Sequence, residues 1–150
     1  MLEYLERLRG DDAIVYVVTN SGTEEVNAAL TSLGEAGAWV AKNVHGNAKK
    51  FVIDDSHPLA IPGLVRRAAA GRPHYEKVLR DIMLREGCPP SSMVVVGDIL
   101  EFDLLLPLRL GMQISLVGDH SLEYERAFVA ANNGVNKFTP WSIPRQPSPA

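Results

Sequence analysis

The chain has 150 residues, of which 46% are hydrophobic, so it is long enough for one ordinary domain with a buried core. Its formal net charge is −3, with 15 basic and 18 acidic residues interspersed, and no basic patch indicates a nucleic-acid or membrane partner. The single cysteine, Cys88, excludes an internal disulfide and fits a reducing compartment. No apolar run approaches the roughly 20 residues of a membrane span, and we expect a soluble cytoplasmic protein.

Hydrophobic patterning in the first half of the chain predicts helices and strands in turn. Leu2, Leu5 and Leu8 recur at helical spacing before Gly10, and the uninterrupted apolar run at 13–18 is typical of a strand covered on both faces. The ambiguous segment is residues 35–48, and the predicted elements are a helix over 2–9, a strand over 13–18, a helix from about Thr23 to Gly34, a strand over 50–53 and a turn over 54–58.

The second half continues the alternation and contains the most regular helix. Pro73 stands where a first helical turn tolerates proline, and an apolar stripe runs from Tyr75 to Met83 before Gly87. The other elements are a strand over 93–96, a helix through Leu104 and Leu108 to Gly111, a strand over 112–117, a helix from Tyr124 to Ala131 before Gly134, and a proline-rich tail over 139–150. Alternating strands and helices favour an α/β fold with a largely parallel sheet.

Chemistry-bearing residues stand where predicted strands end or helices begin. Thr19, Asn20 and Ser21 combine a hydroxyl, an amide and the N–H groups of a helix start, which suits an anion such as phosphate. Arg72, directly before Pro73, places a guanidinium at the head of the most regular helix. From there it could reach the same anion.

Asp98 and Asp103 are candidate ligands of a hard cation. Asp98 follows the apolar run that ends at Gly97, and Asp103 comes five residues later, in a tight turn that enters a helix. In that arrangement both carboxylates would converge on one divalent cation. This stretch alone leaves open that Asp98 caps a helix and that Asp103 is a solvated helix residue.

Taken in order, these motifs resemble the haloacid dehalogenase (HAD) superfamily, whose members are mostly Mg²⁺-dependent phosphohydrolases. The apolar strand ending at Thr19 is similar to the second motif of the family, and Arg72 before Pro73 is similar to the third, with arginine in place of the usual lysine. Gly97-Asp98 through Asp103 is similar to the fourth, Gly-Asp-x-x-x-x-Asp. The resemblance implies a Rossmann-like parallel sheet with flanking helices.

The resemblance covers residues 2–138 and makes residues 1–138 a partial HAD-like core. It implies roles in phosphate binding, charge neutralisation and Mg²⁺ binding for a phosphorylated small-molecule substrate. Phosphate binding falls on Thr19, Asn20 and Ser21. Charge neutralisation falls on Arg72, and Mg²⁺ binding falls on Asp98 with Asp103. For the basic role Lys49, Lys50 and Lys77 are alternatives, although each is more simply explained as a solvated surface lysine.

The first motif of the family, a strand ending in Asp-x-Asp that supplies the nucleophile and the general acid and base, has no match before Thr19. The cap domain that many members insert after it is also absent. We therefore expect a catalytically incomplete, C-terminal portion of a longer hydrolase, whose sheet lacks its central nucleophile strand. A partner strand, or a missing N-terminal segment of the same protein, would complete it.

Other interpretations stay open at this stage. Asp54, after the apolar residues 51–53, is an internal stand-in for the nucleophile, although a turn after an edge strand explains it more simply. A non-catalytic HAD-like binding or interaction module, or an unrelated flavodoxin-like phosphate-binding protein without the usual glycine-rich loop, would share the fold. His120 is the histidine expected to border the site.

Overall fold

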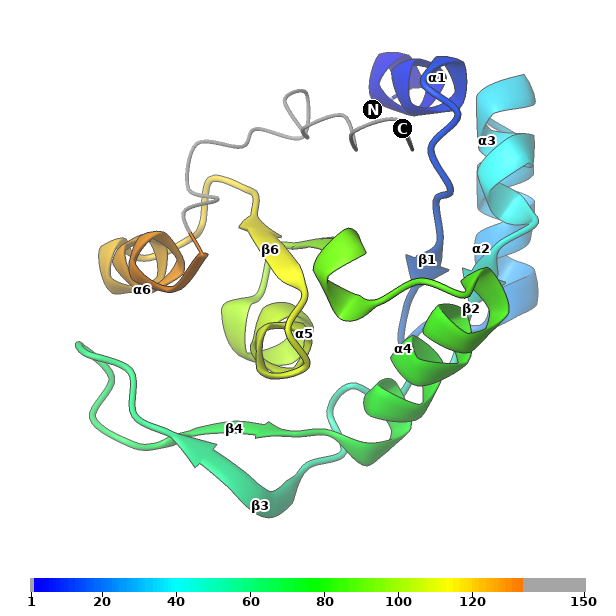
Figure 1. Cartoon of the computed structure of the whole chain (residues 1–150). Helices are drawn as coiled ribbons and strands as arrows, with labels where there is room; N and C mark the ends of the chain where they lie inside the picture. The colour runs from blue at the N-terminus through cyan, green and yellow to red at the C-terminus, as the bar shows by residue number, and fades with distance from the viewer. Residues whose placement is uncertain (1, 134–150) are drawn as a thin grey trace. The chain divides into compact units, whose positions relative to one another are not determined.

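The computed structural model describes residues 2–133 (Figure 1). The chain divides into two compact units, residues 1–50 and residues 51–150. The proline-rich tail predicted at 139–150 lies outside the described residues.

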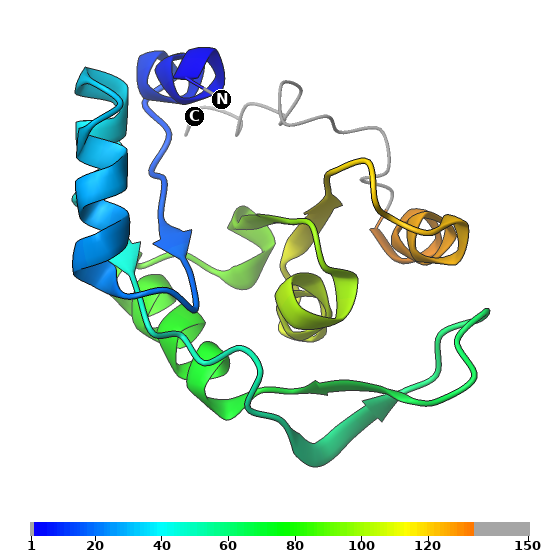
Figure 2. The same ribbon diagram turned by 180° about the vertical axis from the view of Figure 1, so that it is seen from behind.

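The first unit contains a short parallel strand pair and helices that flank it. Its elements are α1 (Leu2–Gly10), β1 (Val17–Val18), α2 (Thr23–Thr31), α3 (Glu35–Ala41) and β2 (Val44–His45). Val17 lies opposite Val44, and Val18 lies opposite His45. Both α2 and α3 lie along one side of this strand pair in the two opposite views (Figure 1, Figure 2). The chain thus crosses from β1 to its parallel partner through two helices.

A small apolar core holds the first unit together. Its buried residues are Leu5, Ala36 and Val40, against which Val15, Val17, Leu30 and Trp39 pack. Gly37 lets α3 approach α2 closely, because a Cβ at that position would lie 2.0 Å from the carbonyl oxygen of Leu30. The packing of α2 on α3 therefore depends on this glycine.

The helices predicted in the first unit are confirmed, but the predicted strand over 13–18 is too long. Only Val17–Val18 forms a strand, because its one partner among the described strands, β2, is itself two residues long. Ile14 is 64% exposed, so this segment is not covered on both faces as predicted. The ambiguous residues 35–48 form α3 and β2.

The second unit begins with an antiparallel hairpin and continues with a parallel strand pair among helices. Its elements are β3 (Asp54–Leu59), β4 (Ala68–Gly71), α4 (Pro73–Glu86), η1 (Pro90–Ser92), β5 (Val94–Gly97), η2 (Leu100–Leu104), α5 (Leu105–Arg109), β6 (Gln113–Leu116) and α6 (Glu123–Asn133). The hairpin pairs β3 with β4 with one irregularity in register. The parallel pair runs from Val94 opposite Gln113 to Gly97 opposite Leu116.

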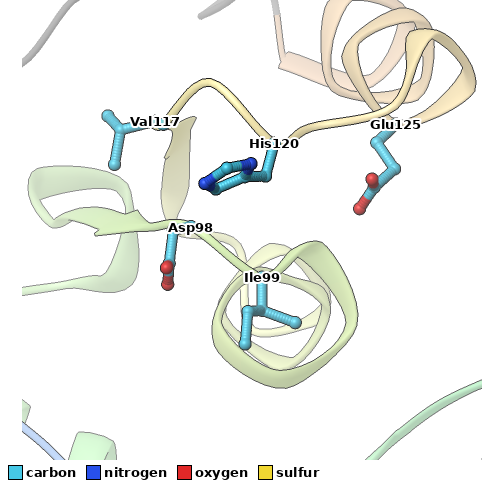
Figure 3. A pocket seen from close by; sticks show the side chains of 6 residues that line it. Asp98, Ile99, Val117, His120 and Glu125 are labelled. Carbon is cyan, nitrogen blue, oxygen red and sulfur yellow. The ribbon is translucent and has the colours of Figure 1, made fainter.

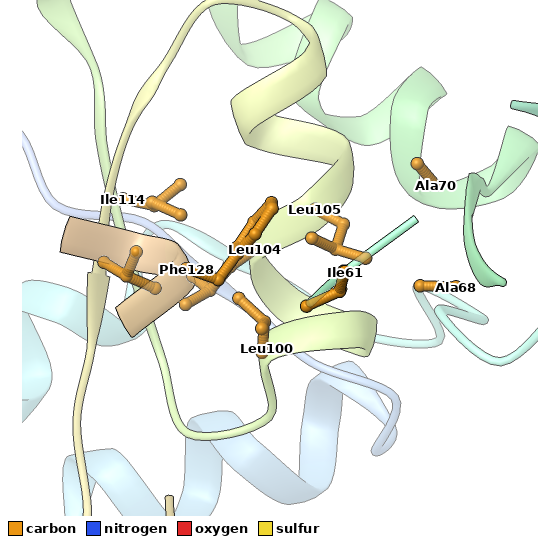
Figure 4. Packing of buried hydrophobic residues seen from close by; sticks show 9 residues of the cluster. Ile61, Ala68, Ala70, Leu100, Leu104, Leu105, Ile114 and Phe128 are labelled. Carbon is orange, nitrogen blue, oxygen red and sulfur yellow. The ribbon is translucent and has the colours of Figure 1, made fainter. Parts of the chain in front are cut away.

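The main core of the second unit forms around η2, which is a π-helix, and the start of α5 (Figure 4). Leu100, Leu104 and Leu105 are at most 2% exposed. They belong to one cluster with Ile114 of β6 and Phe128 of α6. The cluster is completed by Ile61, Ala68, Ala70 and Val129. Because the hairpin, the parallel pair and α6 all contribute to it, this core fixes where β5 ends within the unit.

Helix α4 confirms the most regular predicted element. Tyr75, Leu79 and Ile82 are buried along one face, and Gly87 ends the helix in the left-handed conformation at a φ of 61°. Among the described helices, α4 included, none has both the length and the apolar character needed to cross a membrane.

The strand predicted over 50–53 is wrong, and the turn predicted over 54–58 is strand β3 instead. Phe51 and Ile53 are 59% and 53% exposed, so no layer of described residues covers these two side chains. The six residues of β3 include aspartate, serine and proline, which disfavour strands on intrinsic grounds. Pairing with β4, rather than local propensity, therefore sets this strand.

The mixed α/β class is confirmed, but the extended parallel sheet is not observed. The described residues form three two-stranded sheets, of which β1–β2 and β5–β6 are parallel and β3–β4 is antiparallel. In each parallel pair, one edge of each strand therefore has no strand partner among the described residues.

Candidate functional site

The candidate metal site lies at the carboxyl end of β5, where Asp98 follows Gly97. The Asp98 side chain is exposed, and no described residue donates a hydrogen bond to its carboxylate. The helix that follows has Ile99 as its N-cap residue and has no side-chain cap. Asp98 therefore does not cap a helix, and its carboxylate is available to an external cation.

Asp103 closes the loop that leaves β5. Its Oδ2 accepts a hydrogen bond from the Ile99 N–H at 3.1 Å, and its own N–H donates to the Ile99 carbonyl at 2.8 Å. Gly97 makes room for this side chain, because a Cβ on Gly97 would lie 2.4 Å from the Asp103 Cβ. The buried Tyr75 hydroxyl donates to the Asp103 carbonyl oxygen at 2.9 Å. Asp103 is thus a positioned residue next to Asp98 and not a solvated helix residue.

Arg72 is buried in the second unit, at 2% exposure. Its guanidinium lies over the Phe102 ring at 4.8 Å from the centroid, within cation–π distance. Burial lowers the pKa of the Arg72 guanidinium, and the carboxylates of Glu101 and Asp103 oppose that shift. The predicted basic residue therefore lies near one of the two predicted metal ligands, in a setting that disfavours water.

Glu101 ties η2 to the hairpin. Arg66 donates two hydrogen bonds to its carboxylate, at 2.9 and 2.5 Å, and the Ala69 N–H donates a third at 2.9 Å. The hydrogen bond from Arg66 is the main cause that lowers the pKa of Glu101. Because its acceptors are occupied within the fold, Glu101 is a structural carboxylate and not a candidate metal ligand.

A cavity of about 360 Å³ opens beside Asp98, at the carboxyl ends of both β5 and β6 (Figure 3). Its lining residues are Asp98, Ile99, Val117, Gly118, His120 and Glu125. Figure 3 shows the His120 ring extending from the loop after β6 toward the Asp98 end of β5. The carboxyl ends of parallel strands are where α/β proteins place their ligands. The histidine expected to border the site therefore lines the same cavity as Asp98.

In the first unit, Thr19, Asn20 and Ser21 lie in the loop between β1 and α2, and the loop after β2 is bonded onto it. The Ser21 N–H donates to Thr19 Oγ1 at 3.2 Å, and the Lys50 N–H donates to Asn20 Oδ1 at 2.8 Å. The Ala48 N–H donates to the Thr19 carbonyl at 2.9 Å. These bonds occupy several of the groups predicted to hold an anion, and leave the Asn20 amide N–H groups and the Thr19 hydroxyl proton as donors.

The charges at the start of α2 include some that favour the binding of an anion and some that oppose it. The partial positive charge of a helix N-terminus attracts anions, but Glu24 and Glu25 lie in its first turn. Sequence reasoning did not foresee that the loop containing Lys49 and Lys50 is hydrogen-bonded to the Thr19 to Ser21 segment. The sequence signal for this close approach of the two loops was the glycine at position 46, because a Cβ on Gly46 would lie 2.2 Å from the Thr23 N atom.

Asp54 opens β3 and belongs to a separate polar cluster. Its Oδ1 accepts hydrogen bonds from the Ser56 N–H, at 2.9 Å, and from the Ser56 hydroxyl, and the pKa of Asp54 is lowered mainly by that hydroxyl. Arg109 donates to His57 Nε2 at 3.1 Å, and His57 Nδ1 lies 2.6 Å from Ser56 Oγ. Arg109 also bonds Glu76 of α4. Asp54 therefore stands on an antiparallel hairpin in a hydrogen-bonded cluster that sequence reasoning missed.

The predicted site residues fall into two sets, one in each unit. The second unit brings together Arg72, Asp103 and the end of β5, whereas Thr19 to Ser21 belong to the first unit. Among the described residues, no group of three or more histidine, cysteine, aspartate or glutamate side chains could hold a metal ion. Mg²⁺ commonly uses one or two protein carboxylates and completes its shell with water and phosphate oxygens. Asp98 and Asp103 fit that donor set.

Lys77, one of the alternative basic residues, is an exposed helix residue that donates to Asp81 at 2.8 Å, one turn away. This arrangement is typical of a solvated helix face. Comparison of the chain with protein-family models, with curated proteins and with solved structures finds no match.

Proposed function

We propose that the chain carries the Mg²⁺- and phosphate-binding part of a haloacid-dehalogenase-like phosphohydrolase and is catalytically incomplete by itself. The observation that carries the proposal is the end of β5. There the Asp98 carboxylate, which has no hydrogen-bond or ion-pair partner among the described residues, stands next to a loop that Gly97 and Asp103 hold closed. The substrate class is a phosphorylated small molecule.

Each residue has a physical task in this proposal. Asp98 holds the metal, and Asp103, whose Oδ2 accepts the hydrogen bond from the Ile99 N–H, orients the loop and is the second proposed ligand. Arg72 adds a buried positive charge near Asp103. Bound Mg²⁺ would supply the charge neutralisation that phosphoryl transfer requires. Thr19 and Asn20, considered within the first unit alone, are the proposed phosphate-binding residues there, through the Thr19 hydroxyl proton and the Asn20 amide N–H groups.

The test is calorimetric titration of Mg²⁺ into the full chain and into Asp98→Asn. We expect Asp98→Asn to weaken binding by about 100-fold, because loss of a direct ligand should cost at least as much as loss of a supporting residue. Asp55→Asn is the matched control, because Asp55 is also an exposed carboxylate of the second unit. Equal affinity in the wild type and Asp98→Asn would rule out the metal site.

Hydrolysis distinguishes the two functions that share this site. We expect no Mg²⁺-dependent cleavage of an aryl phosphate by the chain alone, because no aspartate occupies the place of the nucleophile before Thr19. Fusion of an apolar strand that ends in Asp-x-Asp should produce activity if the chain is an incomplete hydrolase. Mg²⁺ binding through Asp98 without activity in either protein would instead favour the non-catalytic binding module.

A further inference from the structure

The polar cluster around Asp54 on β3 contains one continuous chain of hydrogen bonds that runs in a single direction. The Arg109 guanidinium has no acceptor atom and can only donate, so His57 Nε2, at 3.1 Å, accepts with its lone pair. The neutral imidazole then carries its proton on Nδ1 and donates it to Ser56 Oγ at 2.6 Å. The Ser56 hydroxyl in turn donates to Asp54 Oδ1. These bonds hold His57 in the tautomer that has its lone pair on Nε2.

The two nitrogens of this histidine ring have surroundings of opposite charge. On the Nε2 side, Glu76 accepts hydrogen bonds from Arg109 and, at 3.1 Å, from Arg80, so one carboxylate and two guanidinium groups leave a net charge of +1. On the Nδ1 side, the hydrogen bonds from Ser56 lower the pKa of Asp54, so its carboxylate stays ionised. An anion is therefore attracted toward Nε2, and a positive charge that develops on the ring is balanced through Nδ1.

The histidine of this cluster is accessible, and three elements of the second unit position it. His57 is exposed, so a small molecule can reach its ring. Gly71 of β4 leaves room for the cluster, because a Cβ there would lie 2.0 Å from Asp54 Oδ1 and 2.8 Å from Ser56 Oγ. Arg109 is the last residue of α5. Strands β3 and β4 and helix α5 thus place a nucleophilic nitrogen atom beside a guanidinium group at the surface.

We propose that His57 Nε2 is a phosphoryl-acceptor site for a small, activated phosphoryl donor of the phosphoramidate class. The Nε2 lone pair forms the N–P bond while the bond from phosphorus to the leaving group breaks, and the leaving group departs with that electron pair. The zwitterion of phosphoramidate releases neutral ammonia in this step and needs no further proton.

Each member of the cluster has a task in this reaction. Arg109 exchanges its bond to His57 Nε2 for bonds to the phosphoryl oxygens. Nδ1 keeps its proton, so the product ring is positively charged and Asp54 balances it through Ser56. Ser56 and Asp54 are positioning residues, because they touch the ring and not the donor. The step uses neither Mg²⁺ nor Asp98 and is therefore independent of the function proposed above.

The test treats the full chain with phosphoramidate and EDTA at about pH 7.5, where histidine is ordinarily neutral. Mass spectrometry of peptides, kept out of acid because the N–P bond of phosphohistidine is acid-labile, gives the rate at each histidine. His74 is the matched control, because it is also an exposed histidine of the second unit. We expect His57 to react about tenfold faster than His74, because Arg109 adds a charge-assisted hydrogen bond to the transferred group. NMR of the product should place the phosphorus on Nε2.

Variants separate the reaction from support of the fold. Arg109→Gln should lower the rate at His57 to that at His74, and amide NMR signals of α4 check that the second unit stays folded. Ser56→Ala should slow His57 by about threefold and let both tautomers form, whereas Ser56→Thr, which keeps the hydroxyl, should retain the rate and the tautomer. The ¹⁵N chemical shifts of the ring report the tautomer directly. If Arg109→Gln unfolds, the two Ser56 variants still decide.

Several results would overturn the acceptor proposal. They are equal rates at His57 and His74, attachment of the phosphorus to Nδ1 of His57, and an unchanged rate in folded Arg109→Gln. A His57 ring protonated on Nε2 in the untreated chain would also refute it, because that nitrogen would have no lone pair to attack with. A reaction that requires Mg²⁺ and is lost in Asp98→Asn would assign the chemistry to the metal site instead.

Discussion

Gly97→Ala tests whether the loop after β5 is held closed by direct packing of Asp103 on the strand. A Cβ on Gly97 would lie 2.4 Å from the Asp103 Cβ and 2.9 Å from its Oδ2. Real Cβ atoms do not approach backbone-attached carbons this closely, so either β5 or the loop must move. The atom in the way is itself a Cβ, which cannot rotate aside as the end of a long side chain could.

The expected loss of stability follows from two opposing terms. Overpacking of a tight site costs about 1–3 kcal/mol, and replacing glycine with alanine returns about 0.4–1 kcal/mol through the unfolded state. We expect the free energy of unfolding to fall by about 1–2 kcal/mol. In urea this lowers the midpoint by about 0.5–1 M for a slope of about 2 kcal/mol per M. Amide NMR signals of α4 report unfolding of the second unit.

A second pair of variants identifies the cause of that loss. Asp103→Gly removes the Cβ that the new methyl group would meet, whereas Asp103→Ala keeps it and removes the same carboxylate. Gly97→Ala should therefore cost little in the Asp103→Gly background and about 1–2 kcal/mol in the Asp103→Ala background. Equal costs in the two backgrounds would refute the packing argument.

Two further variants probe the support of the same loop. Tyr75→Phe removes the hydroxyl that donates to the Asp103 carbonyl, and it should lower the free energy of unfolding by about 1 kcal/mol in urea titrations. Glu101 has a pKa lowered below its ordinary 4.5 by the Arg66 hydrogen bond, so its contribution to stability is present above that value and is lost as the pH falls through the lower, folded pKa. The stability advantage of the wild type over Glu101→Gln should therefore shrink as the pH is lowered below 4.5, and a constant advantage would contradict the ion pair.

Local patterns predicted the elements whose burial follows from their own periodicity. The stripe that includes Tyr75, Leu79 and Ile82 gives α4 a single buried face, and left-handed Gly87 ends it. The apolar runs before Gly97 and around Ile114 similarly define β5 and β6. In these segments neighbouring residues in the sequence carry most of the information.

Strand β3 could not be predicted from its own residues. Its polar sequence depends on pairing with β4, where Asp54 lies opposite Gly71. Gly71 leaves room for this carboxylate, because a Cβ there would lie 2.0 Å from Asp54 Oδ1 and the exposed Asp54 side chain would have to move aside. The apolar Phe51 and Ile53 indicated a strand, but they have no layer to pack against within their unit.

The candidate site was predictable only in part for the same reason. Asp98 and Asp103 belong to one short motif, whereas the stacking of Arg72 on Phe102 joins residues that are far apart in the sequence. The pairing of Arg66 with Glu101 likewise depends on the hairpin meeting η2. Such contacts are set by the tertiary core and leave no local pattern.

The central claim is that the carboxyl end of β5 binds a divalent cation through Asp98. Mn²⁺ tests this most directly, because as a paramagnetic substitute for Mg²⁺ it broadens the NMR signals of nearby amides. We predict that substoichiometric Mn²⁺ broadens the amides of Asp98, Ile99 and Gly118, that excess Mg²⁺ restores them, and that Asp98→Asn abolishes the effect. Broadening that is absent from these amides, or that persists in Asp98→Asn, would contradict the account.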